Sequence, residues 1–185
     1  MAEDAREQQA ATIAPGAAAP AAIGPADPRP ARILMIASYV VGGIGILLGL
    51  WWISSDPVAS AYAAAAIGVG ATGTLSFVRH SILHRSDAAR MGWDHGRRND
   101  FQIEVGFANL AIGLIGLGAW ALDWGVTAAG AAVVAYGVYI ACSALLHLSE
   151  LRRPADQGGG RVGPVVNAAI FATAPLVVGI AAVTG

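Results

Sequence analysis

The sequence predicts an all-α fold: a bundle of five transmembrane helices that follows a disordered N-terminal tail. The chain is 56% hydrophobic and only 12% charged, whereas an average soluble domain is about 25% charged. Its mean hydropathy is +0.59. Repeated apolar stretches approach the roughly 20 residues that a helix needs to cross about 30 Å of hydrocarbon. These observations indicate an integral membrane protein.

The chain divides into two parts by composition. Residues 1–30 are rich in Ala and Pro and cannot bury enough apolar surface to become ordered, so we expect a disordered cytoplasmic tail. Residues 31–185 contain the transmembrane domain, with helices expected at about 33–53, 57–78, 101–122, 125–146 and 164–183. The expected N-caps are Asp56 before the second helix, Asn99 or Asp100 before the third, and Asp123 before the fourth.

The arginines predict the orientation. If five helices alternate, all 11 basic residues fall on one side: in the tail, between the second and third helices, and between the fourth and fifth. Cytoplasmic loops carry such an excess, so the N-terminus is expected inside and the C-terminus outside. An interfacial aromatic belt is expected at the outer helix ends, formed by Trp51, Trp52, Trp120 and Trp124.

Composition also bears on partners. The formal net charge of −1 offers no electrostatic basis for binding nucleic acid. The lipid bilayer is the expected partner. Gly45 and Gly49 form a GxxxG pair, which suits either a dimer face or close packing within one bundle. A homo-oligomer or a larger membrane complex is therefore left open.

Polar side chains gather near the expected cytoplasmic ends of four helices. A charged group in lipid is costly and normally faces the interior of a bundle, where it finds a partner. Spacing suggests that His80 and His84 share one helix face, and we expect the third helix to present its polar side chains to one broad groove. The residues concerned are His80, His84, Gln102, Glu104, Asn109, Ser143, His147, Glu150 and Asn167.

The first interpretation of this cluster is a metal site. His80, His84, Glu104 and His147 are the candidate ligands, because imidazole and carboxylate groups from facing helices suit zinc, iron or copper. A haem between His147 and one of the other histidines is a variant. Gln102, Asn109, Ser143, Glu150 and Asn167 would form the supporting polar network.

Two other interpretations stay open. The polar groups can form an internal network that only fixes helix packing, with Glu104 paired to Arg79 or to protonated His80. They can also mark a path for protons, ions or small solutes. In addition, the arginine-rich loop 84–100 suits anionic headgroups or a phosphate-bearing ligand, although the positive-inside bias alone accounts for it. The sequence does not decide whether the protein is an enzyme.

The stretch SILHRSDAARMGW, followed by FQIEVGFANLAIGLIG, resembles an uncharacterised family of small bacterial integral membrane proteins. These share a histidine-bearing second helix, a Gly-Trp pair in the loop and an FQxExGxANL run. The resemblance covers about residues 75–120 and is otherwise one of hydropathy. It implies a multi-pass protein of the bacterial inner membrane and no known activity.

Overall fold

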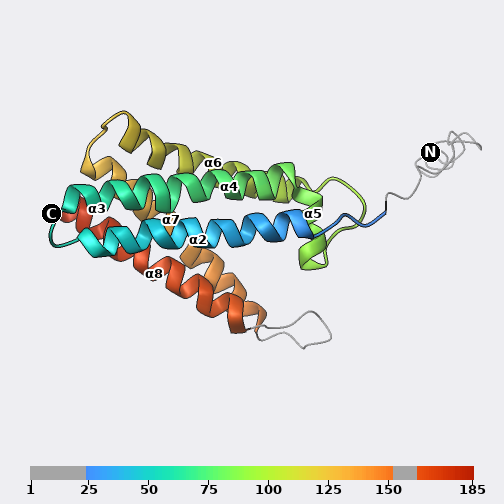
Figure 1. The fold of residues 1–185 in the computed structure, drawn as a ribbon. Coiled ribbons are helices and arrows are strands. Elements are labelled where there is room, and N and C mark those ends of the chain that lie inside the picture. Colours follow the sequence, from blue (N-terminus) through green and yellow to red (C-terminus); the bar gives the residue numbers. More distant parts are fainter. Residues whose placement is uncertain (1–23, 152–161) are drawn as a thin grey trace, which may run out of the picture.

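The computed structural model describes residues 24–151 and 162–185, and those described residues are all helical or irregular. Five of the described helical stretches are long and apolar enough to cross a membrane, which confirms the predicted fold class. Figure 1 shows the spans alternating in direction, with the beginning of α2 and the end of α8 at opposite ends of the bundle. In chain order the elements are α2 (Arg29–Trp52), α3 (Pro57–Ala63), η1 (Ala64–Ala71), α4 (Thr72–Phe77), η2 (Val78–Ile82), α5 (His84–Met91), α6 (Asp100–Ala121), α7 (Val126–Glu150) and α8 (Val162–Thr184).

Most boundaries lie close to the predicted ones. Asp56 accepts a hydrogen bond from the Ala59 amide at 2.9 Å, and Asn99 accepts one from the Gln102 amide at 3.1 Å, so both predicted caps are confirmed. The cap predicted at Asp123 is wrong, because its carboxylate accepts the Tyr62 hydroxyl and α7 begins after Gly125. Most of the predicted tail, residues 1–23, lies outside the described residues.

The second span, built from α3, η1, α4 and η2, is the central helix of the bundle. Its most apolar window is 56% buried, against 28–33% for the other spans. The buried face of this span consists mainly of Ala and Gly, which allow the backbones of neighbouring helices to come close. Two stretches, η1 and η2, are π-helical, and such wider turns change which residues face each neighbour.

Glycines of α2 pack against small residues of the second span within the same chain. A Cβ atom on Gly45 would lie 2.5 Å from the Cα of Gly68, and one on Gly49 would lie 3.0 Å from the Cβ of Ala64. The GxxxG pair of α2 therefore packs against the second span. Packing within one bundle accounts for these glycines, as one of the two sequence interpretations predicted.

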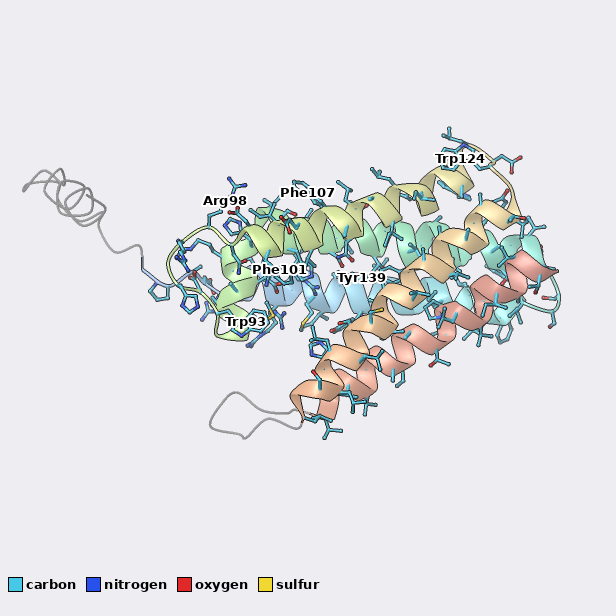
Figure 2. The ribbon with its side chains drawn as sticks, turned by 180° about the vertical axis from the view of Figure 1, so that it is seen from behind. Trp93, Arg98, Phe101, Phe107, Trp124 and Tyr139 are labelled. Carbon is cyan, nitrogen blue, oxygen red and sulfur yellow. The ribbon has the colours of Figure 1, made fainter. Side chains whose placement is uncertain are left out.

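The last two helices form a hairpin that diverges from the rest. α7 packs mainly against α8, and the hydrophobic core joins them to α2, η1 and α6 near the C-terminal end of the molecule through residues such as Val69, Val133 and Val178. Figures 1 and 2 both show α7 and α8 leaving α2 and α6 toward the end where α8 begins. Within the described residues, neither α7 nor α8 packs against η2 or α5.

Replacing Gly45 with alanine is expected to lower the free energy of unfolding by about 1–3 kcal/mol, the range for overpacking a tight contact. The added methyl would overlap the Gly68 backbone, which cannot move aside as a flexible side chain could. Thermal unfolding in mild detergent measures the loss. Gly43→Ala is the matched control, because a Cβ there meets only the Phe171 ring at 4.0 Å. Equal melting temperatures for the two variants would contradict this packing.

Candidate functional site

The central helix changes geometry where its polar residues begin. Arg79 and His80 lie in the π-helical turn η2, and the helix is interrupted at Leu83 (φ −98°, ψ 28°) before α5 begins at His84. The Nδ1 atom of His84 lies 3.1 Å from the Ser81 carbonyl oxygen, whereas the ring of His80 contacts Arg79, Gln102 and Asp87. The predicted shared face for His80 and His84 is therefore wrong, because regular α-helical spacing does not continue between them.

His80 connects the central helix to α6. Its Nδ1 atom lies 2.7 Å from Oε1 of Gln102, and its Nε2 atom contacts a terminal guanidinium nitrogen of Arg79. Since arginine can only donate, Nε2 accepts and Nδ1 carries the proton that is donated to Gln102.

Asp87 on α5 is the centre of this end of the molecule. Its side chain is completely buried, and its Oδ1 atom accepts a hydrogen bond from Nε of Arg90 at 2.9 Å. Oδ2 lies 2.9 Å from Nδ1 of His80, while Oδ1 lies 3.8 Å from Nε of Arg79. A buried carboxylate requires such partners, because an unpaired charge away from water costs several kcal/mol or more. We call Arg79, His80, Asp87, Arg90 and Gln102 the Asp87 network.

The electrostatics of the network keep Asp87 ionised. Burial raises the pKa of Asp87, but the contact with His80 and the charges of Arg79 and Arg90 outweigh burial and hold the pKa below its usual value. Among the described residues, Asp87 Oδ2 and Arg79 Nε are shielded from solvent and have no hydrogen bond of good geometry. Nδ1 of His80 lies 2.7 Å from Oε1 of Gln102 and 2.9 Å from Oδ2 of Asp87, so the two oxygens share this one donor.

A second set of contacts attaches α5 and the following loop to the segment before α2. Arg85 donates to both oxygens of Asp94, at 3.2 and 3.0 Å, and to the carbonyl of Gly24 at 2.8 Å. The hydroxyl of Ser86 donates to the carbonyl of Asp27 at 2.6 Å and accepts the Ala31 amide at 3.2 Å. We call residues 24–28, α5 and the loop 92–99 the cap. The cap covers the end of the bundle that carries the described arginines.

Gln102 and Asn109 face inward on α6, as predicted. Both are buried, and Asn109 donates to the hydroxyl of Tyr139 at 3.1 Å as well as to the carbonyl of Val105 at 2.8 Å. Figure 2 labels Tyr139 on α7, from which it reaches α6. These two amides therefore tie α6 to η2 on one side and to α7 on the other.

Glu104 lies on the face of α6 opposite to Gln102 and Asn109 and is directed away from the bundle. It is exposed beside Arg98 and Phe107 on the outer face of α6. Two residues advance an α-helix by about 200°, so Glu104 lies nearly opposite Gln102. The predicted groove shared by Gln102, Glu104 and Asn109 is wrong for this reason, and Glu104 pairs with neither Arg79 nor His80.

The polar residues of α7 and α8 lie on the diverging hairpin. Ser143, His147 and Asn167 are half-buried there, and the side chain of Glu150 lies outside the described residues. Since neither helix packs against η2 or α5, His147 is not brought to His80 or His84. Within the described part of the chain, no three His, Cys, Asp or Glu side chains come together to hold a metal ion. Metal or haem binding by His80, His84, Glu104 and His147 stays a prediction without geometric support.

Asp87, Asp94 and their arginine partners are not among the site residues predicted from the sequence. A signal was present in HRSDAAR, where one carboxylate stands among arginines and lies seven residues after His80. Hydropathy predicts that the second helix ends near residue 78 and that a loop follows, so it gives no sign of the helix that turns Asp87 inward.

Comparison with known proteins places the chain in a family. A family model described as a family of unknown function, DUF6790, matches residues 28–184. The chain belongs to this family. No match to the chain was found among curated proteins or among solved structures. The predicted resemblance to an uncharacterised family is thus confirmed at that level, and the match includes every described span.

Acidification is expected to weaken the cap. The hydrogen bonds from Arg85 lower the pKa of Asp94 from 3.8 to about 2. A depressed carboxylate pKa stabilises the fold above the unfolded value, and this contribution disappears as the pH falls through the folded value. The melting-temperature difference between wild type and Asp94→Asn should therefore be full above about pH 4 and should narrow toward pH 2. Asp87 is present in both proteins, so its titration changes both melting temperatures alike and does not alter the difference between them.

Melting curves in mild detergent at several pH values measure this difference. His95→Ala, a change in the exposed neighbouring side chain, is the control and should follow wild type throughout. A difference that stays constant down to the lowest pH would refute the assignment of Arg85 and Asp94 as a cap-stabilising pair.

Proposed function

We propose that this chain is a structural or accessory protein of the bacterial inner membrane, whose buried polar groups lock the helix ends and the cap together. The single observation that carries the proposal is Asp87, a completely buried carboxylate surrounded by Arg79, His80 and Arg90. A buried charge of this kind fixes one arrangement of its neighbours, because any other arrangement leaves it unpaired.

The other polar contacts support the same role. His80 links η2 to α6, Asn109 links α6 to α7, and Ser86 links α5 to the start of α2. Each contact joins different elements, as a packing lock requires. The folded cap is the surface that such a protein would present to a larger membrane complex or to another copy.

The proposed orientation puts the cap in the cytoplasm and the C-terminus outside. Within the described residues, all the arginines lie at the cap end of the molecule, and Trp51, Trp120 and Trp124 are exposed at the opposite end. Figure 2 shows Trp124 at the end far from Trp93 and Arg98. The positive-inside rule and the aromatic belt favour the same orientation.

Asp87→Asn should lower the free energy of unfolding by roughly 3 kcal/mol, since removing one partner of a buried ion pair leaves the other charges uncompensated. Thermal unfolding in detergent measures the loss. Asp100→Asn is the matched control, because Asp100 forms an exposed pair with Arg98 and such pairs contribute about 0–1 kcal/mol. Equal melting temperatures for the two variants would refute the proposed role of Asp87 in holding the helix ends together.

A double-mutant cycle tests whether the loss comes from the network itself. Asp87→Asn should lower the free energy of unfolding less in an Arg79→Met background than in wild type, by a difference of about 1 kcal/mol or more. The reason is that contacting charged groups are energetically coupled. Additive costs would show that Arg79 and Asp87 do not stabilise one another. Wild-type folding of every variant, judged by helical circular dichroism, is required for the comparison.

Cysteine labelling tests the orientation. In a Cys142→Ser background, His95→Cys in the cap and Ser54→Cys at the opposite end are exposed positions. A membrane-impermeant maleimide should label Ser54→Cys in intact spheroplasts and His95→Cys only after the membrane is opened. The reverse pattern would overturn the proposed topology without affecting the fold.

A further inference from the structure

Beyond its first residue, Asp100, the outer face of α6 is apolar except at Glu104. Phe101 and Phe107 are 68% and 56% exposed there, and Leu114 continues the same face toward the far end of the helix. Gln102 and Asn109 lie on the buried face. Glu104 stands among the exposed apolar side chains, so its carboxylate is directed to the surroundings of the bundle and takes no part in the Asp87 network.

The depth of Glu104 brings it within reach of lipid headgroups. α6 has 22 residues, which makes it about 33 Å long against a hydrocarbon core of about 30 Å. Glu104 lies four residues after the first residue of α6, or about 6 Å along the axis. A carboxylate just inside the hydrocarbon boundary is costly unless it meets a cation or a strong hydrogen-bond donor.

Within the described residues, no ion pair or hydrogen bond reaches Glu104. The nearest acidic group, Asp100, is already paired with Nε of Arg98 at 2.6 Å. The missing partner must therefore come from outside this part of the chain. Its chemistry is indicated by the side chains around Glu104.

Glu104 borders a surface hollow that combines three kinds of side chain. A cation, Arg98, and two carboxylates, Asp100 and Glu104, lie beside Ile103 and Phe107. Figure 2 shows Arg98 and Phe107 on the outer side of α6, near its beginning. The side chain of Arg98 is 72% exposed, and its guanidinium carries five N–H donors, so an anion from outside the bundle can reach it. The hollow thus combines a guanidinium that can bind an anion, two carboxylates that can bind a cation, and an apolar wall for an acyl chain.

We propose that this hollow binds the headgroup of an aminophospholipid such as phosphatidylethanolamine. Its phosphate would lie at Arg98, its primary ammonium between Asp100 and Glu104, and an acyl chain along Phe107. A primary ammonium has three N–H donors for the two carboxylates, whereas the trimethylammonium of phosphatidylcholine has none. An anionic headgroup would place no cation at Glu104 and would leave that carboxylate unpaired.

Native mass spectrometry of the full chain tests this proposal. The protein, purified in mild detergent, is mixed with equal amounts of phosphatidylethanolamine, phosphatidylcholine and phosphatidylglycerol that carry the same acyl chains. Wild type should retain phosphatidylethanolamine about three- to ten-fold more than phosphatidylcholine, the ratio expected from about one net hydrogen bond. Glu104→Gln should bring this ratio close to one.

Two further variants separate the parts of the site. Arg98→Gln should weaken retention of phosphatidylethanolamine and phosphatidylcholine alike, because both carry the phosphate. Arg97→Gln is the matched control: this neighbouring arginine does not line the hollow, so the wild-type preference should persist. Since Glu104 is exposed and outside the Asp87 network, failure of this proposal leaves the proposed lock untouched.

Equal retention of phosphatidylethanolamine and phosphatidylcholine by wild type would overturn the proposal. Preference that survives in Glu104→Gln would also overturn it, as would a higher retention of phosphatidylglycerol. A dimer mass that disappears in Glu104→Gln would identify a second copy as the partner of Glu104 in place of lipid. Glu104→Ala serves as a second variant, because it should lose the preference to the same extent as the amide variant.

Discussion

The close contact between α2 and the second span is the constraint on which the rest of the structure depends. The backbone of Gly68 lies so close to Gly45 that a Cβ atom on Gly45 would overlap it, and a Cβ atom on Gly68 would lie 2.9 Å from the side chain of Ile46. In lipid, apolar surface gains little from association as such, so helices associate through tight packing and hydrogen bonds. The Ala- and Gly-rich second span supplies that packing to every neighbour. The other spans are arranged around it and turn their larger side chains outward.

The same central helix determines where charge can be buried. After its small-residue stretch it widens into η2 and breaks at Leu83, so that α5 folds back over the end of the bundle. Asp87 then comes into contact with Arg79 and His80. The buried charges are tolerated because each has partners from another turn or helix, and because the surrounding backbone is held by the cap.

The hairpin of α7 and α8 divides the polar residues into separate groups. It joins the bundle near the C-terminal end and diverges toward the cap, and within the described residues the hydrogen bond between Asn109 and Tyr139 connects α6 to α7. Glu104 is separated from both groups by the rotation of α6. The polar residues toward this end of the molecule thus form three groups: the buried Asp87 network, the hydrogen bond between α6 and α7, and Glu104 on the exposed face of α6.

The sequence by itself determined the number of spans, their alternation, the caps at Asp56 and Asn99, and the inward direction of Gln102 and Asn109. These features follow from local hydropathy, N-cap chemistry and the spacing of residues on one helix. Only the tertiary structure decided that Glu104 points outward from the network, that His147 lies apart from His80, and that Asp87 is the buried centre. Those outcomes depend on the rotation of each helix, on a π-helical turn and on the angle between helices. Helix rotation, the π-helical turn and the angle between helices all depend on how several segments pack at once, so they cannot be predicted from any single stretch of sequence.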